Sequence, residues 1–154
     1  MKHPGIWPQF YTATIQNWKP LLSKDEYKSI TTDCLAFLVN DNRIVLNAFV
    51  VMNNHVHLIW QPLHQYSLTQ MQSSFMSFTA KSIIKNLALN NPDLLESIRV
   101  HKHDRRFQVW KREPLSIELF TQNVFIQKLN YIHNNPVMAG LVSSAEEYAF
   151  SSAA

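Results

Sequence analysis

The stretch VVMNNHVHLIW, residues 50–60, decides how the centre of the chain folds. Apolar residues stand on both sides of Asn53 and Asn54, and asparagine tolerates the left-handed backbone angles of a tight turn. The sequence therefore predicts two antiparallel strands, residues 43–52 and 55–61, joined at this pair of asparagines.

The second of these strands carries two histidines separated by one valine. Side chains alternate along a strand, so His55 and His57 point to one face and Val56 points to the other, where it packs into the core. The two histidine Cβ atoms lie roughly 7 Å apart in such a strand. Neutral imidazole binds Zn, Mn, Fe or Cu, but two ligands make an incomplete metal site. The alternative is a pair of half-exposed histidines without a ligand, because chance alone nearly supplies this pattern in a chain with seven histidines.

Strand and helix patterns continue on both sides of the hairpin. Upstream, β-branched and aromatic residues predict a strand over residues 10–16. A helix over residues 23–39 follows, with Ser23 as its expected N-cap. Downstream, apolar residues at helical spacing predict a long helix over residues 68–89.

The second half of the chain completes the pattern. FQVW, residues 107–110, predicts a short strand, and we expect a final helix over residues 116–133, before Pro136. The order then begins with the ferredoxin-like βαββαβ pattern, an α+β fold in which helices cover one face of an antiparallel sheet. We expect residues 1–154 to form a single domain with an added C-terminal helix that carries Tyr131.

Composition excludes several classes of protein. The chain has only two glycines, which argues against a glycine-rich loop that binds phosphate. Cys34 is the only cysteine, so a cysteine-rich zinc site is excluded and a reducing cytoplasm fits. No apolar run approaches the roughly 18 residues needed to cross a bilayer, so we expect a soluble, cytoplasmic protein. The net charge of +3 is weak evidence for a nucleic-acid partner.

A tyrosine and an asparagine share one side of the last predicted helix, within LNYIHNNPVMAGLV, residues 129–142. Tyr131 and Asn135 are four residues apart, so they lie about 40° apart around a helix. Asn135 precedes Pro136, which predicts the end of the helix there. From spacing alone, the favoured interpretation of Tyr131 is a core residue whose hydroxyl is satisfied.

These two motifs together resemble the single-tyrosine HUH transposases, a group that includes the REP-associated tyrosine transposases. In HUH, a bulky hydrophobic residue stands between two histidines, as Val56 does here. The resemblance covers most of the chain, from FYTATIQ to the closing EEYAFSSA. One departure is Asn53, because the family more often has proline at that position, and we expect only a slightly different turn from it.

The resemblance implies a role for particular residues. Tyr131 matches the nucleophile, His55 and His57 match the metal-binding pair, and Asn135 matches the polar residue that completes the metal site; His133 is a lesser candidate. The family's metal is Mg²⁺ or Mn²⁺, and its reaction is cleavage and transfer of single-stranded DNA through a 5′-phosphotyrosine link. Hairpin DNA is the implied partner, and a homodimer is one arrangement that relatives adopt. The alternatives are a domesticated protein that binds hairpin DNA without strand transfer, and a metal-dependent phosphodiesterase.

A basic segment, RVHKHDRRFQVWKR, supplies a candidate DNA surface. Residues 99–112 hold six of the fourteen Lys and Arg residues, interleaved with aromatic residues, as is typical of surfaces that bind single strands. The histidines at positions 101 and 103 lie among these charges and predict a solvated loop or a segment that contacts phosphates. The alternative is a solvated loop whose aromatic residues anchor it to the core. The predicted DNA-binding residues are Arg99, Lys102, Arg105, Arg106, Trp110, Lys111 and Arg112.

Overall fold

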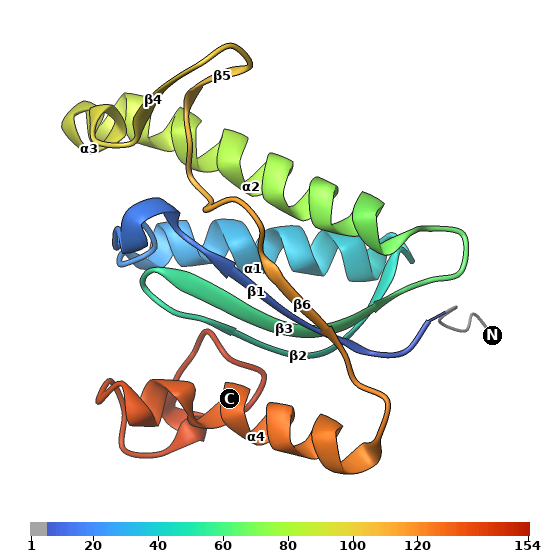
Figure 1. Ribbon diagram of the computed structural model, residues 1–154. Helices are drawn as coiled ribbons and strands as arrows, with labels where there is room; N and C mark the ends of the chain where they lie inside the picture. Colours follow the sequence, from blue (N-terminus) through green and yellow to red (C-terminus); the bar gives the residue numbers. More distant parts are fainter. Residues whose placement is uncertain (1–5) are drawn as a thin grey trace.

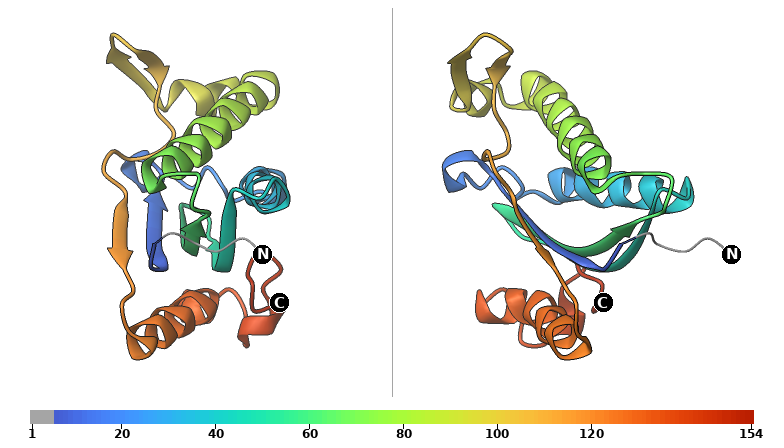
Figure 2. Two further views of the ribbon diagram at one scale, coloured as in Figure 1. Left: turned by 90° about the vertical axis from the view of Figure 1, so that its right-hand side faces the viewer. Right: turned by 45° about the vertical axis from the view of Figure 1, so that its right-hand side comes forward.

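A four-stranded antiparallel sheet with the strand order β2-β3-β1-β6 forms the centre of the chain in the computed structural model, which describes residues 6–154 (Figure 1). Two long helices cover one face of the sheet, and a third helix lies on the other (Figure 2). The fold is therefore α+β, as the sequence predicts. The sheet strands are β1 (Gln9–Thr14), β2 (Ile44–Val51), β3 (His55–Pro62) and β6 (Leu115–Glu118). The helices are α1 (Asp25–Asn40), α2 (Leu68–Asn90), the short α3 (Pro92–Glu96) and α4 (Gln122–Met138), with 3₁₀ turns η1 (Gln16–Trp18) and η2 (Ala145–Glu147).

The sheet has a hydrophobic core on each face because its central strands are buried on both sides. On β3, Val56, Leu58 and Trp60 pack with α1 and α2, whereas Ile59 packs with α4. Each of these four side chains is fully buried, which stabilises the fold by roughly 1.5–3 kcal/mol per large apolar side chain. This two-sided burial fixes the register of β3, and with it the face on which the histidines lie.

The hairpin between β2 and β3 is confirmed, but its turn differs from the expected one. Val51 pairs with Val56, and the Met52 amide donates to the carbonyl of His55 at 2.8 Å. Neither Asn53 nor Asn54 has a positive φ, so the predicted left-handed turn is wrong. Their backbone carbonyls instead accept hydrogen bonds from the amides of Leu22 and Ile15, both at 2.9 Å, and these bonds to a neighbouring segment fix the turn.

The starts of the two long helices were predicted with different success. α2 begins where expected, because Ser67 and Gln70 form a reciprocal capping box. At α1 the predicted cap is wrong. The Ser23 hydroxyl donates to the Pro20 carbonyl at 2.8 Å, and Lys24 occupies the N-cap position without a side-chain cap.

The largest correction concerns residues 107–121. The fourth strand of the sheet is β6, which overlaps the start of the segment expected to be helical, and α4 begins only at Gln122, capped by Thr121. FQVW does not form a sheet strand: Phe107 ends β5, and Trp110 makes a single bridge to Ile15. Pairing with β1 explains the difference, because four residues of β6 form ladder pairs that local sequence cannot predict.

The predicted end of the last helix is also wrong, because α4 continues through Pro136 to Met138. A separate two-stranded hairpin, β4 (Arg99–Lys102) and β5 (Arg105–Phe107), projects beyond α2 (Figure 1). Residues 108–114 then run back past α2 to β6. No helix within residues 6–154 is both long and apolar enough to cross a membrane.

Candidate metal and tyrosine site

The two histidines of β3 lie together on the face of the sheet that α4 covers. Their ring centroids are 4.7 Å apart, and the rings are inclined at 70°. The Nδ1 atom of each ring has a polar partner: Thr12 Oγ1 lies 2.8 Å from His57 Nδ1, and Asn54 Oδ1 accepts from His55 Nδ1 at 2.7 Å. Such partners orient imidazoles and leave Nε2 of each ring as the nitrogen for a metal.

Both imidazoles are held neutral at neutral pH. The pKa of His57 is lowered to about 3, first by burial, and then because a charge on its ring would repel a protonated His55 and the ammonium of Lys128. The pKa of His55 is also lowered by burial, against a side-chain hydrogen bond with Asn135 that raises it. Neutral imidazole is the form that binds metal ions, so the electrostatics of the pair favour coordination.

Tyr131 and Asn135 of α4 face this pair of histidines. The Tyr131 ring lies 5.2 Å from the His57 ring between centroids, and the Asn135 side chain is close enough to His55 to raise the pKa of its imidazole. Tyr131 is 50% exposed, so the alternative of a core tyrosine is wrong, and its neighbour Ile132 is the buried residue. Two motifs more than seventy residues apart thus meet at one site because α4 packs on β2 and β3.

Phe10 and Lys128 belong to the same site, and the sequence did not reveal them. The Phe10 ring stacks on His57 at 5.4 Å and meets Tyr131 edge to face at 6.1 Å. Lys128 Nζ lies 4.8 Å from the Phe10 ring centroid and 5.7 Å from that of Tyr131. Lys128 could have been found, because it stands three residues before Tyr131 on one helix face. Phe10 and Thr12 could not, because only the strand register brings them here.

The other histidines named from the sequence lie elsewhere. His133 points to the C-terminal segment, where its Nε2 lies 2.8 Å from Ser152 Oγ. His101 and His103 are exposed on the β4–β5 hairpin, beyond α2 (Figure 1).

The donor set at this site suits a divalent metal. Within residues 6–154 no three or more His, Cys, Asp or Glu side chains gather into a metal-binding group. The candidate set is therefore two imidazoles with the amide oxygen of Asn135, a mixed nitrogen and oxygen set for a first-row divalent metal, in which the imidazoles suit Zn²⁺ or Fe²⁺ and the amide oxygen suits Mn²⁺. Three protein ligands leave positions open for a substrate oxygen.

The basic segment divides into exposed cations and a buried aromatic anchor. Trp110 is buried, and its Nε1 donates to Thr79 Oγ1 at 2.9 Å, so the prediction that Trp110 stacks on DNA bases is wrong. Arg99 pairs with Glu96, Arg105 with Asp104, and Lys102 donates to Gln108. All six cations of residues 99–112 are exposed.

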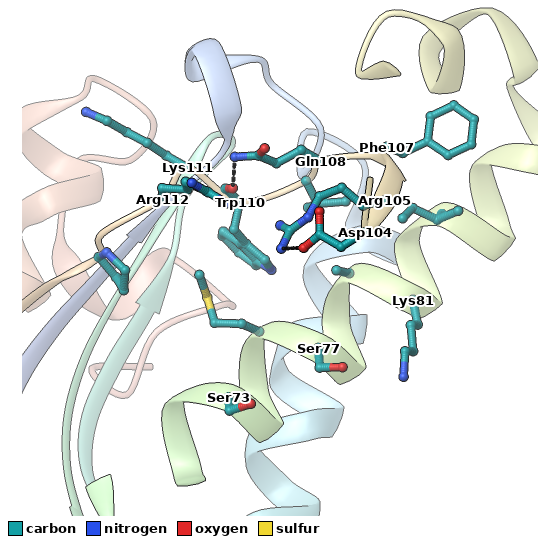
Figure 3. Close-up of a pocket in the computed structure, with 15 residues that line it drawn as sticks. Ser73, Ser77, Lys81, Asp104, Arg105, Phe107, Gln108, Trp110, Lys111 and Arg112 are labelled. Carbon is teal, nitrogen blue, oxygen red and sulfur yellow. Dashed lines mark hydrogen bonds and ion pairs between the residues drawn. The ribbon is translucent and has the colours of Figure 1, made fainter. Parts of the chain in front are cut away.

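A cavity of about 430 Å³ lies between this segment and α2 (Figure 3). Its lining residues include Lys81 on α2 together with Arg105 and Arg112 of the basic segment. Ser73 and Ser77 line the α2 wall. Lys81 extends the predicted basic surface onto a second element, which the sequence did not indicate because the cavity depends on how the segment crosses the helix.

The fold defined by this sheet and its three long helices is similar to that of two transposases of known structure. A REP-associated tyrosine transposase bound to a REP hairpin matches 98% of this chain and 78% of its own, at 20% identity and a TM-score of 0.66. A candidate transposase from Deinococcus radiodurans R1 matches 87% of this chain and 96% of its own, at 18% identity and a TM-score of 0.54. No family model and no curated protein matches the sequence. The fold that the two sequence motifs imply by resemblance is thereby confirmed.

Proposed function

We propose that the chain is a transposase that cleaves and rejoins single-stranded DNA through a covalent bond to Tyr131. The observation that carries this proposal is the approach of the Tyr131 ring to His57, 5.2 Å between ring centroids, with Asn135 beside His55. Because the phenol of Tyr131 is half-exposed, a DNA strand can reach it. The two neutral imidazoles beside it would hold a metal ion next to this nucleophile. The similar folds of a tyrosine transposase and of a second transposase support this assignment.

In the proposed reaction Tyr131 Oη attacks the scissile phosphorus. The phenolic proton leaves to solvent as the 5′-phosphotyrosine bond forms and the bond between phosphorus and the 3′ oxygen breaks. The 3′ oxygen then takes up a proton and leaves as a free hydroxyl. A second 3′-hydroxyl then attacks the phosphotyrosine and restores the phenol, so rejoining needs no ATP. Mg²⁺ or Mn²⁺ held by His55, His57 and Asn135 would supply Lewis-acid stabilisation of charge on the phosphate. Thr12 and Asn54 hold the two imidazoles in the ligating orientation.

The exposed cations of residues 99–112, with Lys81, form the proposed surface for the DNA backbone. They border the cavity beside α2 or project on the β4–β5 hairpin, and several positive charges on one surface favour phosphate contacts. The REP hairpin bound to the similar transposase supports hairpin DNA as the partner. The proposed place of action is the cytoplasm. The proposed active form is one chain or a homodimer.

A covalent adduct tests the proposal most directly. The protein is incubated with Mn²⁺ and a broad set of hairpin oligonucleotides that carry single-stranded flanks, and a denaturing gel is run. We expect a protein–DNA adduct in the wild type and none in Tyr131→Phe or His55→Ala. Cleavage that persists in Tyr131→Phe and is lost in His55→Ala would instead identify a phosphodiesterase. Binding to hairpins without any cleavage across the set would identify a DNA-binding protein.

A further inference from the structure

A groove runs between α1 and α2, and the proposed reaction does not use it. Tyr27 Oη donates to Asn86 Oδ1 at 2.8 Å, and further along the helices Phe37 and Phe78 line one hollow of about 470 Å³. The two helices are therefore antiparallel, with the groove between them. They cover the face of the sheet opposite α4, so this α1–α2 groove and Tyr131 lie on different sides of the sheet (Figure 2).

The α1–α2 groove has an apolar floor and two exposed aromatic side chains. Cys34 and Leu38 of α1 line it and are buried. Phe37 and Phe78 are each 54% exposed, and neither belongs to a hydrophobic core of residues 6–154. Exposed phenylalanines contribute little to folding, so two of them beside a hollow are typical of a surface that another molecule covers.

Two cations border the α1–α2 groove, and no acidic residue in the described part of the chain lines it. The Arg43 guanidinium lies 5.2 Å from the Phe37 ring centroid, and its Nε donates to Asp41 at 2.7 Å, which uses one of its five N–H groups. Lys81 of α2 forms no ion pair within residues 6–154, and its side chain points away from Arg105 (Figure 3). The groove therefore combines apolar surface with positive charge.

This combination fits one kind of occupant. A second copy of the chain, related by a two-fold axis at the groove, would bring Arg43 and Lys81 against the same cations, which is unfavourable. A DNA strand finds only two cations here, one of them beside the carboxylate of Asp41, whereas residues 99–112 supply six. An amphipathic helix carries apolar side chains at i and i+4 with carboxylates beside them, and a groove between two helices accepts a third helix.

We propose that the α1–α2 groove binds an acidic amphipathic helix of a partner protein. Apolar side chains of that helix pack on Phe37 and Phe78 and on the floor of the groove, and its carboxylates pair with Arg43 and Lys81. This interaction goes beyond the proposed function. Because the groove and Tyr131 lie on opposite sides of the sheet, the partner and a DNA strand can be held at the same time.

A peptide selection tests this surface without DNA or metal. Random displayed peptides of about 15 residues, roughly four helical turns, are selected on the immobilised chain, and an enriched peptide is labelled for fluorescence anisotropy. We expect enrichment of apolar residues at i and i+4 together with Asp or Glu. Phe37→Ala and Phe78→Ala should each weaken binding about tenfold. Leu89→Ala is the matched control, because Leu89 is 78% exposed on α2 outside the groove, and it should bind as the wild type does.

A charge reversal guards against a folding defect. Lys81→Glu should lose the peptide, and a peptide with lysine in place of one of its acidic residues should bind this variant again, which a misfolded protein would not do. Arg43→Gln should weaken binding and reduce its dependence on salt.

Four results would overturn the inference. They are a selection that enriches no peptide or only peptides without carboxylates, and equal binding by the wild type and Phe78→Ala. The others are a wild-type dimer that Phe78→Ala converts to a monomer, and displacement of the peptide by a single-stranded oligonucleotide that binds Phe78→Ala more weakly. These would make the groove an interface between copies or a nucleic-acid surface. Because adduct formation plays no part, failure of this inference and failure of the cleavage reaction are read separately.

Discussion

The two faces of the sheet differ in how completely they are closed. On the face that α1 and α2 cover, Tyr11, Val56, Leu58 and Trp60 meet the helices in one continuous core. On the other face, α4 packs mainly on β2 and β3, and the open part holds two imidazoles, a half-exposed phenol and the exposed side chains of Leu115 and Ile117 on β6. One face therefore supplies most of the stability, while the other tolerates polar and exposed groups that folding alone would not favour. Substitutions on the two faces should accordingly separate stability from chemistry.

The largest expected effect is the loss of the adduct in Tyr131→Phe. The substitution removes only the nucleophilic oxygen from a half-exposed ring, so we expect no phosphotyrosine and an unchanged thermal unfolding midpoint. Tyr148→Phe is the matched control. Its buried hydroxyl donates to the Val51 carbonyl at 2.7 Å, so that variant should lose about 1 kcal/mol of stability and keep the adduct. A denaturing gel and a thermal melt measure both quantities, and an adduct in Tyr131→Phe would rule out the proposed nucleophile.

The converse behaviour is expected for Phe75→Ala on the closed face. Phe75 is fully buried against Tyr11, Trp60 and Trp110, and truncating a buried Phe costs about 3–5 kcal/mol. The free energy of unfolding in urea measures this loss. Phe78→Ala, three residues further along the same helix and exposed, should change stability by less than about 0.5 kcal/mol. Equal effects of the two variants would mean that the closed face is not the main source of stability.

Prediction from sequence succeeded where the pattern is local and failed where it depends on pairing. The β2–β3 hairpin, the two long helices and the shared face of His55 and His57 follow from alternation and helical spacing. β6 was missed because its Leu-Ser-Ile-Glu sequence is short and its identity as a strand comes from β1. Likewise, only the register places Thr12 beside His57, and only tertiary packing buries Trp110 under an otherwise basic segment.

Lowering the pH should reduce the free energy of unfolding, because His57 on the open face must take up a proton. Its pKa is lowered from 6.5 to about 3 in the folded state, so the unfolded chain binds more protons between these values, and stability falls as pH falls through this window. Without metal, lowering the pH from 6.5 to about 4 should cost on the order of 3 kcal/mol from this residue. Urea unfolding at several pH values measures the slope. His57→Gln should flatten it, whereas a variant with the same slope as the wild type would show that His57 is not buried as a neutral ring.

The smallest effect is expected for Thr12→Val, which tests how the open face orients its histidines. Valine keeps the β-branched shape that suits β1 and removes the hydroxyl that lies 2.8 Å from His57 Nδ1. Loss of such an orienting partner lowers metal affinity by about 10–100-fold, which titration calorimetry with Mn²⁺ can measure. Thr14→Val is the matched control, because Thr14 pairs with His55 in the same ladder and its hydroxyl makes no hydrogen bond within residues 6–154. If both variants bind Mn²⁺ as tightly as the wild type does, the Thr12 hydroxyl does not contribute to the metal affinity of the site. A weakening confined to Thr12→Val would show that the open face is organised around the ligand nitrogen of His57.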